Sequence, residues 1–223
     1  MSWTSTEVYY RLLNEGVAER LGGLHSARLL LHSVDFDPIA ARQHSGDWAG
    51  TADILGEAAR GLAAAGAEGV LLATNTMHKI ADRVERATGL PLLHIADATA
   101  ESIRGAGLSR VGLLGTAFTM EDSFLVDRLA VHGVEALVPP AAARAEVHRI
   151  IYDELVLDVV REESRATYRA IMADLETAGA QGMVLGCTEI GLLVGAHDTT
   201  VPVFDSTRLH AAAAVDWMLG KDR

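Results

Sequence analysis

GAEGVLLATNT at residues 66–76 recurs, without a gap, as GAQGMVLGCTE at residues 179–189. Each copy starts with a glycine and an alanine, continues into an apolar run and ends in a polar turn. The first polar side chain beyond the run is Thr74 in one copy and Cys187 in the other. A short apolar run closed by a polar turn is typical of a buried strand in a parallel sheet. The duplication therefore predicts two similar units, each with one polar side chain at the end of a strand.

The segments around each copy repeat the same pattern. Residues 52–65 and 165–178 carry apolar residues at three- and four-residue steps, which predicts helices, and a terminating glycine follows each of them. Residues 90–97 and 200–207 each hold a proline-led strand and an aspartate. Helices that alternate with buried strands predict α/β units whose parallel sheets are covered on both faces.

The remaining pattern extends this prediction over the whole chain. Further strands are predicted at 27–34, 111–114 and 134–138, and further helices at 5–21, 77–88, 99–105, 121–131, 143–176 (broken near 157–162) and 207–219. The predicted domains are residues 1–98 plus 207–223, and residues 99–206.

One asymmetry separates the two halves. The strand at 111–114 leads into a threonine-rich turn and a helix, whereas the first half supplies the turn and helix in residues 1–13 with no strand before them. Internal symmetry predicts that the N-terminal strand of the first domain is missing and belongs ahead of Met1, unless another segment takes its place.

The composition of the chain argues against several classes of partner and cofactor. The formal net charge of −11 argues against nucleic acid or an anionic membrane as partner, but is compatible with a small anionic substrate. The chain lacks an apolar run long enough to cross a bilayer and a basic, apolar signal segment, so a cytoplasmic location is expected. Its single cysteine suits a reducing compartment. Zinc, calcium and dinucleotide motifs are not found, and with Lys79 and Lys221 as the only lysines a pyridoxal-phosphate (PLP) enzyme is not expected.

Thr74 and Cys187 are the candidate functional pair. Both follow a predicted strand at the edge of the sheet where α/β proteins bind ligands. The helices beyond them would offer N–H groups to a carboxylate and would lower the pKa of Cys187. The alternative is that Cys187 is an inert buried thiol.

The family resemblance rests on four stretches distributed over the chain. They are ATNTMH at 73–78, GCTEIGLL at 186–193, MSW-x-ST-x-x-YY at 1–10 and VPVFDST at 201–207. Together they resemble the aspartate/glutamate racemases, which are PLP-independent, over essentially the whole length. The resemblance implies two flavodoxin-like three-layer lobes related by a pseudo-twofold, an active site in the cleft between them, no cofactor and a homodimer. Members of the family begin with a strand and Gly-Gly ahead of the MSW segment, in agreement with the strand predicted there.

The resemblance also implies a mechanism. Family members use two thiols on opposite faces of the substrate α-carbon, one to remove its proton and one to donate a proton. Cys187 keeps one of these positions, and Thr74 replaces the other thiol. The chain resembles a branch with this Thr/Cys pair that acts on L-aspartate and L-glutamate. Cys187 would be the base and Thr74 the donor, so that L-to-D turnover is favoured kinetically while the equilibrium is unchanged.

Substrate-binding residues are predicted from the same comparison. Asn75, Thr76 and Thr188 would hold the α-carboxylate, and Glu189 would either accept from the ammonium group or cap a helix. The remaining candidates are Thr116 and Thr119 in a ligand loop, Gln43 and Arg165 for the distal carboxylate, Met1 in a turn that touches ligand, and His78 as a supporting residue or an ordinary helix histidine.

Two other functions stay open. The first is a cofactor-free decarboxylase or cis-trans isomerase on the same fold, which needs one active cysteine and no donor at Thr74. The second is a non-catalytic protein that binds acidic amino acids. Exchange of the substrate α-proton in D2O separates these from racemisation.

Overall fold

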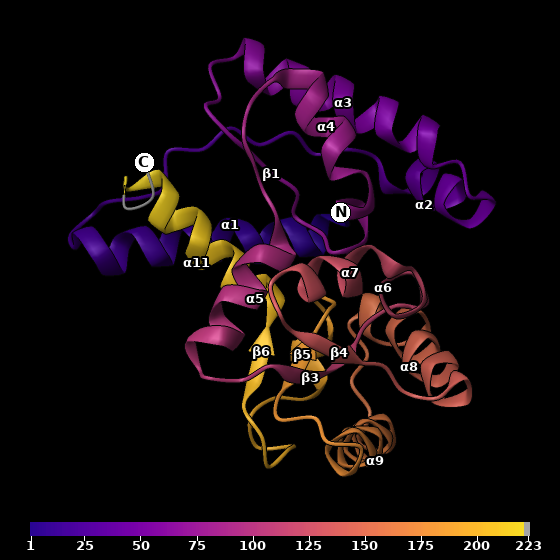
Figure 1. The fold of residues 1–223 in the computed structure, drawn as a ribbon. Helices are drawn as coiled ribbons and strands as arrows, with labels where there is room; N and C mark the ends of the chain where they lie inside the picture. The colour runs from indigo at the N-terminus through magenta and orange to yellow at the C-terminus, as the bar shows by residue number, and fades with distance from the viewer. Residues whose placement is uncertain (221–223) are drawn as a thin grey trace. The chain divides into compact units, whose positions relative to one another are not determined.

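The computed structural model describes residues 1–220, so Lys221 and the two residues after it lie outside the described range. The chain forms two compact units (Figure 1). Unit 1 comprises Met1–His94 with Ala211–Arg223, and unit 2 comprises Ile95–His210. Both contain parallel strands between helices, which confirms the predicted α/β class with two lobes. Among the helices of residues 1–220, none combines the length and hydrophobicity that crossing a membrane requires.

Unit 2 is built on a four-stranded parallel sheet in the order β4-β3-β5-β6. Its strands are β3 (Arg110–Leu114), β4 (Glu135–Leu137), β5 (Met183–Leu185) and β6 (Val203–Asp205). Gly112 of β3 lies opposite both Leu137 of β4 and Met183 of β5. The central strand β3 is thus paired on both of its edges.

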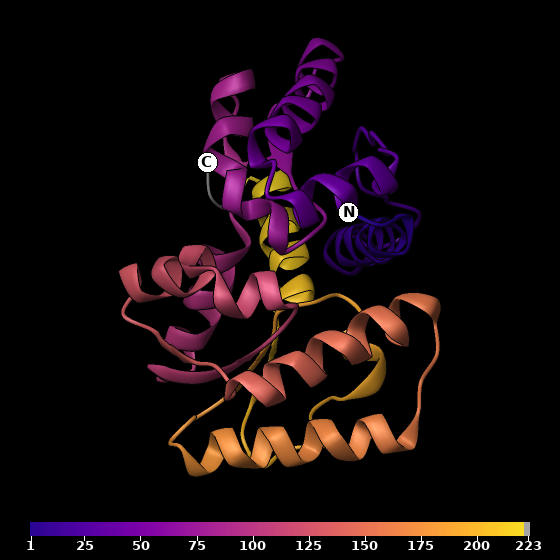
Figure 2. The ribbon, with the colours of Figure 1, turned by 90° about the vertical axis from the view of Figure 1, so that its right-hand side faces the viewer.

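Helices cover both faces of this sheet (Figure 1, Figure 2). They are α5 (Ile95–Gly105) and α7 (Ser123–Val131) on one face, and α8 (Ala141–Asp153) and α9 (Glu162–Thr177) on the other. Successive strand residues point to opposite faces. Leu113 and Val184 pack with α5 and α7, whereas Leu114 and Leu185 pack with α8 and α9. This double burial explains why the apolar runs show no alternation with polar residues.

The shorter elements of unit 2 are α6 (Ala117–Glu121), η2 (Leu155–Leu157) and α10 (Ile190–Leu193), and α11 (Ser206–Met218) continues into unit 1.

Unit 1 has a two-stranded parallel sheet of β1 (Val70–Leu71) and β2 (Leu92–Leu93). Its helices are α1 (Trp3–Leu21), α2 (Phe36–Ser45), α3 (Trp48–Ala64), the 3₁₀ helix η1 (Thr76–Ile80), α4 (Ala81–Thr88) and the last part of α11. Val70 and Leu72 pack against the cluster formed by α2, α3 and α4. Leu71 and Ala73 pack on the opposite side, against α1 and α11. The segment of β1 therefore separates two apolar clusters, as β5 does in unit 2.

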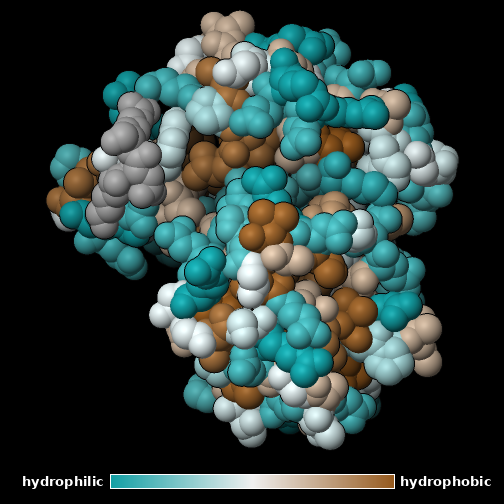
Figure 3. Space-filling model, in the orientation of Figure 1, coloured by the Kyte–Doolittle hydropathy of each residue, from teal (hydrophilic) through white to brown (hydrophobic). Residues whose placement is uncertain are grey.

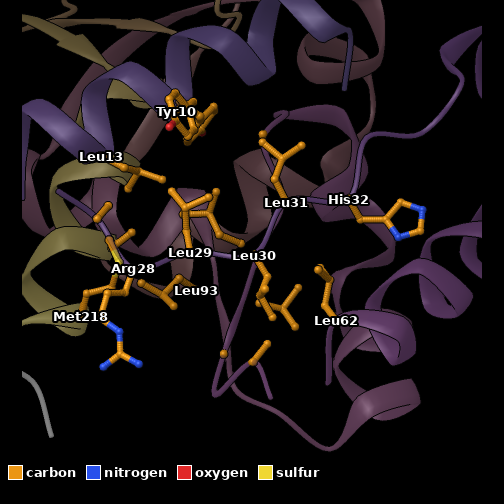
Figure 4. Close-up of a pocket in the computed structure, with 18 of the residues that line it drawn as sticks. Tyr10, Leu13, Arg28, Leu29, Leu30, Leu31, His32, Leu62, Leu93 and Met218 are labelled. Atoms are coloured by element: carbon orange, nitrogen blue, oxygen red, sulfur yellow. The ribbon is translucent and has the colours of Figure 1, made fainter. Parts of the chain in front are cut away.

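The predicted strand at 27–34 is wrong: the segment is extended but belongs to neither sheet. A strand requires a backbone partner as well as apolar side chains. A groove of about 890 Å³ is lined by this segment and by β1 (Figure 4). The helix α2 at Phe36–Ser45 was not predicted at all. Other differences are small: the helix predicted at 99–105 starts at Ile95, the one predicted at 121–131 spans the end of α6 and all of α7, and the break in 143–176 lies at 154–161.

The repeated glycines have matching roles in the two units. Gly66 and Gly179 follow helices with positive φ angles of 94° and 99°, which glycine adopts without strain. A Cβ on Gly69 would lie 2.7 Å from the ring of Trp217, and a Cβ on Gly182 would lie 2.7 Å from the ring of Phe204. The repeat thus preserves a helix end and an aromatic ring packed directly on the backbone before the strand.

Candidate functional site

Cys187 lies just beyond the carboxyl end of β5, as predicted. Gly186 links the ends of two strands, because its N–H donates to Leu114 O at 2.6 Å. A Cβ there would lie 3.0 Å from that oxygen, so the turn leading to Cys187 favours glycine. Ser206 supports the same turn by donating from its hydroxyl to Leu185 O at 2.8 Å. Cys187 therefore follows a segment that is held on both sides.

The thiol of Cys187 has a carboxylate as its partner. Its Sγ donates to Glu189 Oε2 at 2.9 Å, and the cysteine is partly exposed. Burial raises the pKa of Cys187 well above its usual value, and the charge and hydrogen bond of Glu189 raise it further. The predicted lowering of this pKa by the following helix is wrong. That helix, α10, has only four residues, and a negative charge lies in direct contact with the sulfur.

Thr116 and Thr119 lie beside this turn. Thr116 follows β3 and precedes α6, and its hydroxyl lies 3.3 Å from that of Thr119. Both residues are buried. A Cβ on Gly186 would lie 3.1 Å from Thr119 Cγ2, so the methyl group of Thr119 packs against the residue that precedes Cys187. The structure places these two predicted residues beside the turn that leads to Cys187.

A pair of aromatic residues on α8 near Cys187 was not predicted. His148 Nδ1 accepts from the N–H of Ala117 at 3.1 Å, and its ring centroid lies 4.6 Å from that of Tyr152. Burial raises the pKa of Tyr152, and negative charge on Cys187 and Glu189 raises this pKa further. The two residues are one helical turn apart, a spacing that the sequence contained, but no motif linked them to Cys187.

The other predicted residues of unit 2 are positioned as follows. Thr188 follows Cys187 and is partly buried. Arg165, near the start of α9, donates to the carbonyl of Leu193 at the end of α10 and pairs with Glu162 at 3.0 Å. Its side chain is 26% exposed. Arg165 therefore ties α9 to the helix that follows Cys187.

Thr74 occupies the corresponding turn in unit 1. Its N–H donates to Leu72 O at 2.7 Å, and its carbonyl lies 2.9 Å from Nδ1 of His78. Asn75, Thr76 and His78 are all buried. The ring of His78 also stacks edge-on with His94, at 4.7 Å between centroids. His78 thus contacts the backbone of the Thr74 turn.

The N-terminus also reaches the Thr74 turn. The amino group of Met1 donates to Ala73 O at 2.5 Å, and the hydroxyl of Ser5 donates to the same carbonyl at 3.0 Å. Met1 was predicted to lie near ligand, and Ser5 was not. Both hold the peptide group that immediately precedes Thr74.

Gln43 is a buried side chain on α2. Only 5% of the residue is exposed, and within residues 1–220 its Oε1 has no hydrogen-bond partner. Such an atom is costly to bury, and buried polar groups without a partner are rare. Ile39, one turn earlier, packs in the same cluster as Met1 and Met77. The Oε1 atom of Gln43 is therefore a buried acceptor that could take a hydrogen bond from a donor group of a ligand.

Known proteins resemble this chain in sequence and fold. Residues 1–214 match the Asp/Glu/hydantoin racemase family. A proposed Asp/Glu racemase from Yersinia pestis is 53% identical, with a TM-score of 0.94 over 98% of this chain and 96% of its own. An aspartate racemase homologue from Pyrococcus horikoshii is 33% identical, with a TM-score of 0.86 over 98% of this chain and 95% of its own.

A more distant structure shares the fold alone. A mutant of arylmalonate decarboxylase is 19% identical, with a TM-score of 0.51 over 79% of this chain and 78% of its own. The family match and the two relatives above are far more extensive. They cover nearly every described residue, including both turns that carry Thr74 and Cys187. The chain belongs to the Asp/Glu/hydantoin racemase family.

Proposed function

We propose that the protein racemises aspartate or glutamate without PLP, by proton transfer between Cys187 and Thr74. The observation that carries this proposal is the Sγ–H···Oε2 contact of 2.9 Å between Cys187 and Glu189. It gives the chain's single thiol a neighbouring group that can take its proton. Membership of the racemase family and the similarity to an aspartate racemase homologue support an acidic amino acid as substrate.

The proposed cycle starts from the thiol form of Cys187, which its raised pKa favours. The thiol proton passes to Glu189 or to water, and the thiolate removes the α-proton of the L-substrate. Thr74 donates its hydroxyl proton to the opposite face of the same carbon, and water then reprotonates its oxygen. A threonine hydroxyl is a far weaker acid than a thiol, so Thr74 is a poor base for the return reaction. L-to-D turnover is therefore the faster direction.

We assign the substrate contacts by chemistry. Backbone and side-chain donors at Asn75, Thr76 and Thr188 would hold the α-carboxylate, with the hydroxyls of Thr116 and Thr119. Gln43 was predicted to bind the distal carboxylate; we propose instead that its Oε1, which has no hydrogen-bond partner within residues 1–220, accepts from the substrate ammonium group. A distal carboxylate would take Arg165 as partner in competition with Glu162. Met1 would act through the carbonyl before Thr74. By family resemblance we further propose a homodimer that works in the cytoplasm.

Cofactor-free decarboxylation is the second candidate. The raised pKa of Cys187 keeps it as a thiol, which suits protonation of a carbanion left by loss of CO2. The shared fold of arylmalonate decarboxylase supports this reaction class. In that reaction Thr74 has no role, so a Thr74→Ala variant would retain full activity.

Incubation with L-aspartate or L-glutamate in D2O distinguishes the candidates. Racemisation predicts the D-enantiomer with deuterium at Cα and no other product. Decarboxylation predicts release of CO2, and a binding protein predicts bound, unlabelled substrate. The proposal is wrong if both amino acids stay unlabelled and unconverted at saturating concentration.

A further inference from the structure

The turn that carries Thr74 contains several buried polar side chains. Hydrophobic residues gather on the surface around β1 (Figure 3), whereas Asn75, Thr76 and His78, which follow the carboxyl end of β1, are buried. Only 3% of His78 is exposed. Burial of an imidazole without hydrogen bonds costs free energy, so the contacts of its ring nitrogens indicate what the residue does.

The Nδ1 atom of His78 is directed at two carbonyl groups of this turn. It lies 2.9 Å from the oxygen of Thr74 and 3.3 Å from that of Asn75. Carbonyl oxygens only accept hydrogen bonds, so Nδ1 must carry the hydrogen and donate it. The ring of His94 packs edge-on against the same imidazole, with 4.7 Å between the ring centroids. His78 is therefore a fixed donor to two successive peptide groups.

The peptide group before Thr74 is held as well. The hydroxyl of Ser5 donates to the carbonyl of Ala73 at 3.0 Å, and the N–H of Thr74 donates to Leu72 O at 2.7 Å. With His78 on the carbonyls that follow, the backbone is held on both sides of the Thr74 Cα. Since the direction of the Cα–Cβ bond follows from the backbone, the Thr74 hydroxyl keeps only rotation about that bond, among a few staggered positions.

Unit 2 orients its polar residue in a different way. Cys187 is held through its side chain, because its Sγ donates to Glu189 Oε2 at 2.9 Å. In the repeat, Thr76 stands where Glu189 stands. His78 stands where Gly191 stands, so the copy with the carboxylate has no imidazole at this position, and the reverse. This difference between the copies indicates that backbone contacts from His78 take the place of the side-chain contact.

We propose that His78 is a positioning residue that directs the Thr74 hydroxyl at the substrate α-carbon by donating its Nδ1–H to the carbonyls of Thr74 and Asn75. This inference rests on the proposed function, and it gives His78 a part in only one of the two proton transfers. Removal of the α-proton by Cys187 does not need His78, whereas protonation of the opposite face does. The ratio of D-enantiomer formed to deuterium exchanged into the L-substrate reports this difference, whereas a general loss of folded protein lowers both quantities equally.

The test compares His78→Leu with His78→Asn in D2O. Leucine removes the donor, and the amide of asparagine can donate from nearly the place of Nδ1. In His78→Leu the ratio should fall at least about tenfold, because a displacement of about 1 Å at a reacting group can cost about a hundredfold in rate. In His78→Asn it should stay near that of the parent chain. His44→Leu is the matched control, since Nδ1 of His44 also lies near the carbonyl of the residue four positions earlier, at 2.7 Å, but His44 is exposed on α2.

A second measurement does not depend on activity. NMR of the ring nitrogens in the isotope-labelled parent assigns the tautomer of His78, whose signal is the one that His78→Asn lacks. The proposal requires a hydrogen on Nδ1. Amide hydrogen exchange in residues 74–78 should be faster in His78→Leu than in the parent and in His78→Asn, because loss of the donor makes opening of the turn more frequent.

Three results would overturn the proposal: a hydrogen on Nε2 alone, a parental ratio in folded His78→Leu, or an equal fall of the ratio in His44→Leu. If His78→Leu does not fold, the tautomer and the ratio in His78→Asn decide. If the parent converts neither amino acid, the proposed function fails, and the tautomer and the amide exchange still decide whether His78 holds the turn.

Discussion

Replacement of Glu189 by Gln should make Cys187 more reactive. The carboxylate of Glu189 accepts the thiol hydrogen at 2.9 Å, and its negative charge disfavours a second negative charge on the sulfur. Both effects raise the pKa of Cys187. Removing the charge therefore lowers this pKa, and at neutral pH a larger fraction of the sulfur becomes thiolate, the form that reacts with alkylating agents.

The size of the effect follows from the contact. Two unit charges about 4 Å apart interact by about 1 kcal/mol in bulk water and by about 4 kcal/mol near a protein surface. Cys187 and Glu189 are both partly exposed, so we take about 1 kcal/mol as the minimum interaction between their two charges. Since about 1.36 kcal/mol corresponds to a tenfold change in the thiolate fraction, Glu189→Gln should increase that fraction at pH 7 at least about fivefold.

Alkylation by iodoacetamide measures this change directly, because the chain has a single cysteine and every labelling event reports Cys187. Rates are followed by mass spectrometry from pH 6 to pH 10, and the plateau at high pH corrects for differences in access. Glu135→Gln is the matched control, since Glu135 is 61% exposed and begins β4 at the opposite edge of the sheet. A Glu189→Gln rate at pH 7 that equals the parent rate, or falls below it, would refute the reasoning.

Other predictions concern pH and stability. The initial L-to-D rate should rise with pH above neutrality, because a base with a raised pKa becomes thiolate only as protons are removed; a rate that falls from pH 7 to pH 9 in a stable protein contradicts this. Gly182→Ala forces a Cβ to within 2.7 Å of an aromatic ring and should cost about 1–3 kcal/mol in the free energy of unfolding. Gly61→Ala, in open space on α3, should instead raise the free energy of unfolding by about 0.5–1 kcal/mol. Urea titration of both variants measures these changes. Ser164→Ala removes the hydroxyl that donates at 2.5 Å to the buried carboxylate of Glu154 and should cost about 1–3 kcal/mol, whereas Thr167→Ala, on the exposed side of the same helix, should change stability by less than about 0.5 kcal/mol.

Local sequence patterns predicted the two strands that precede Thr74 and Cys187. The repeat placed Thr74 and Cys187 at the ends of two apolar runs, and the structure has a strand at each run. This succeeded because a buried strand and the turn after it depend on a few neighbouring residues. The α/β class followed from the same alternation of helices and strands.

Features that depend on distant contacts were beyond the sequence. The segment at 27–34 has the composition of a strand, but its state depends on a partner along its edge. The pKa of Cys187 was predicted to fall from a general helix effect, whereas the observed contact with Glu189 has the opposite sign. His148 and Tyr152 lie on a helix far from Cys187 in the sequence, and only the folding of α8 reveals their relation to it.

The central claim is that Cys187 removes the α-proton of the L-substrate and Thr74 completes the inversion. Deuterium incorporation into L-glutamate and L-aspartate, measured by NMR in D2O beside the appearance of the D-enantiomer, separates these two steps. The account predicts that Cys187→Ala abolishes both, while Thr74→Ala still exchanges the L-substrate through the thiol but forms almost no D-enantiomer. Undiminished exchange in Cys187→Ala, or undiminished inversion in Thr74→Ala, would contradict it.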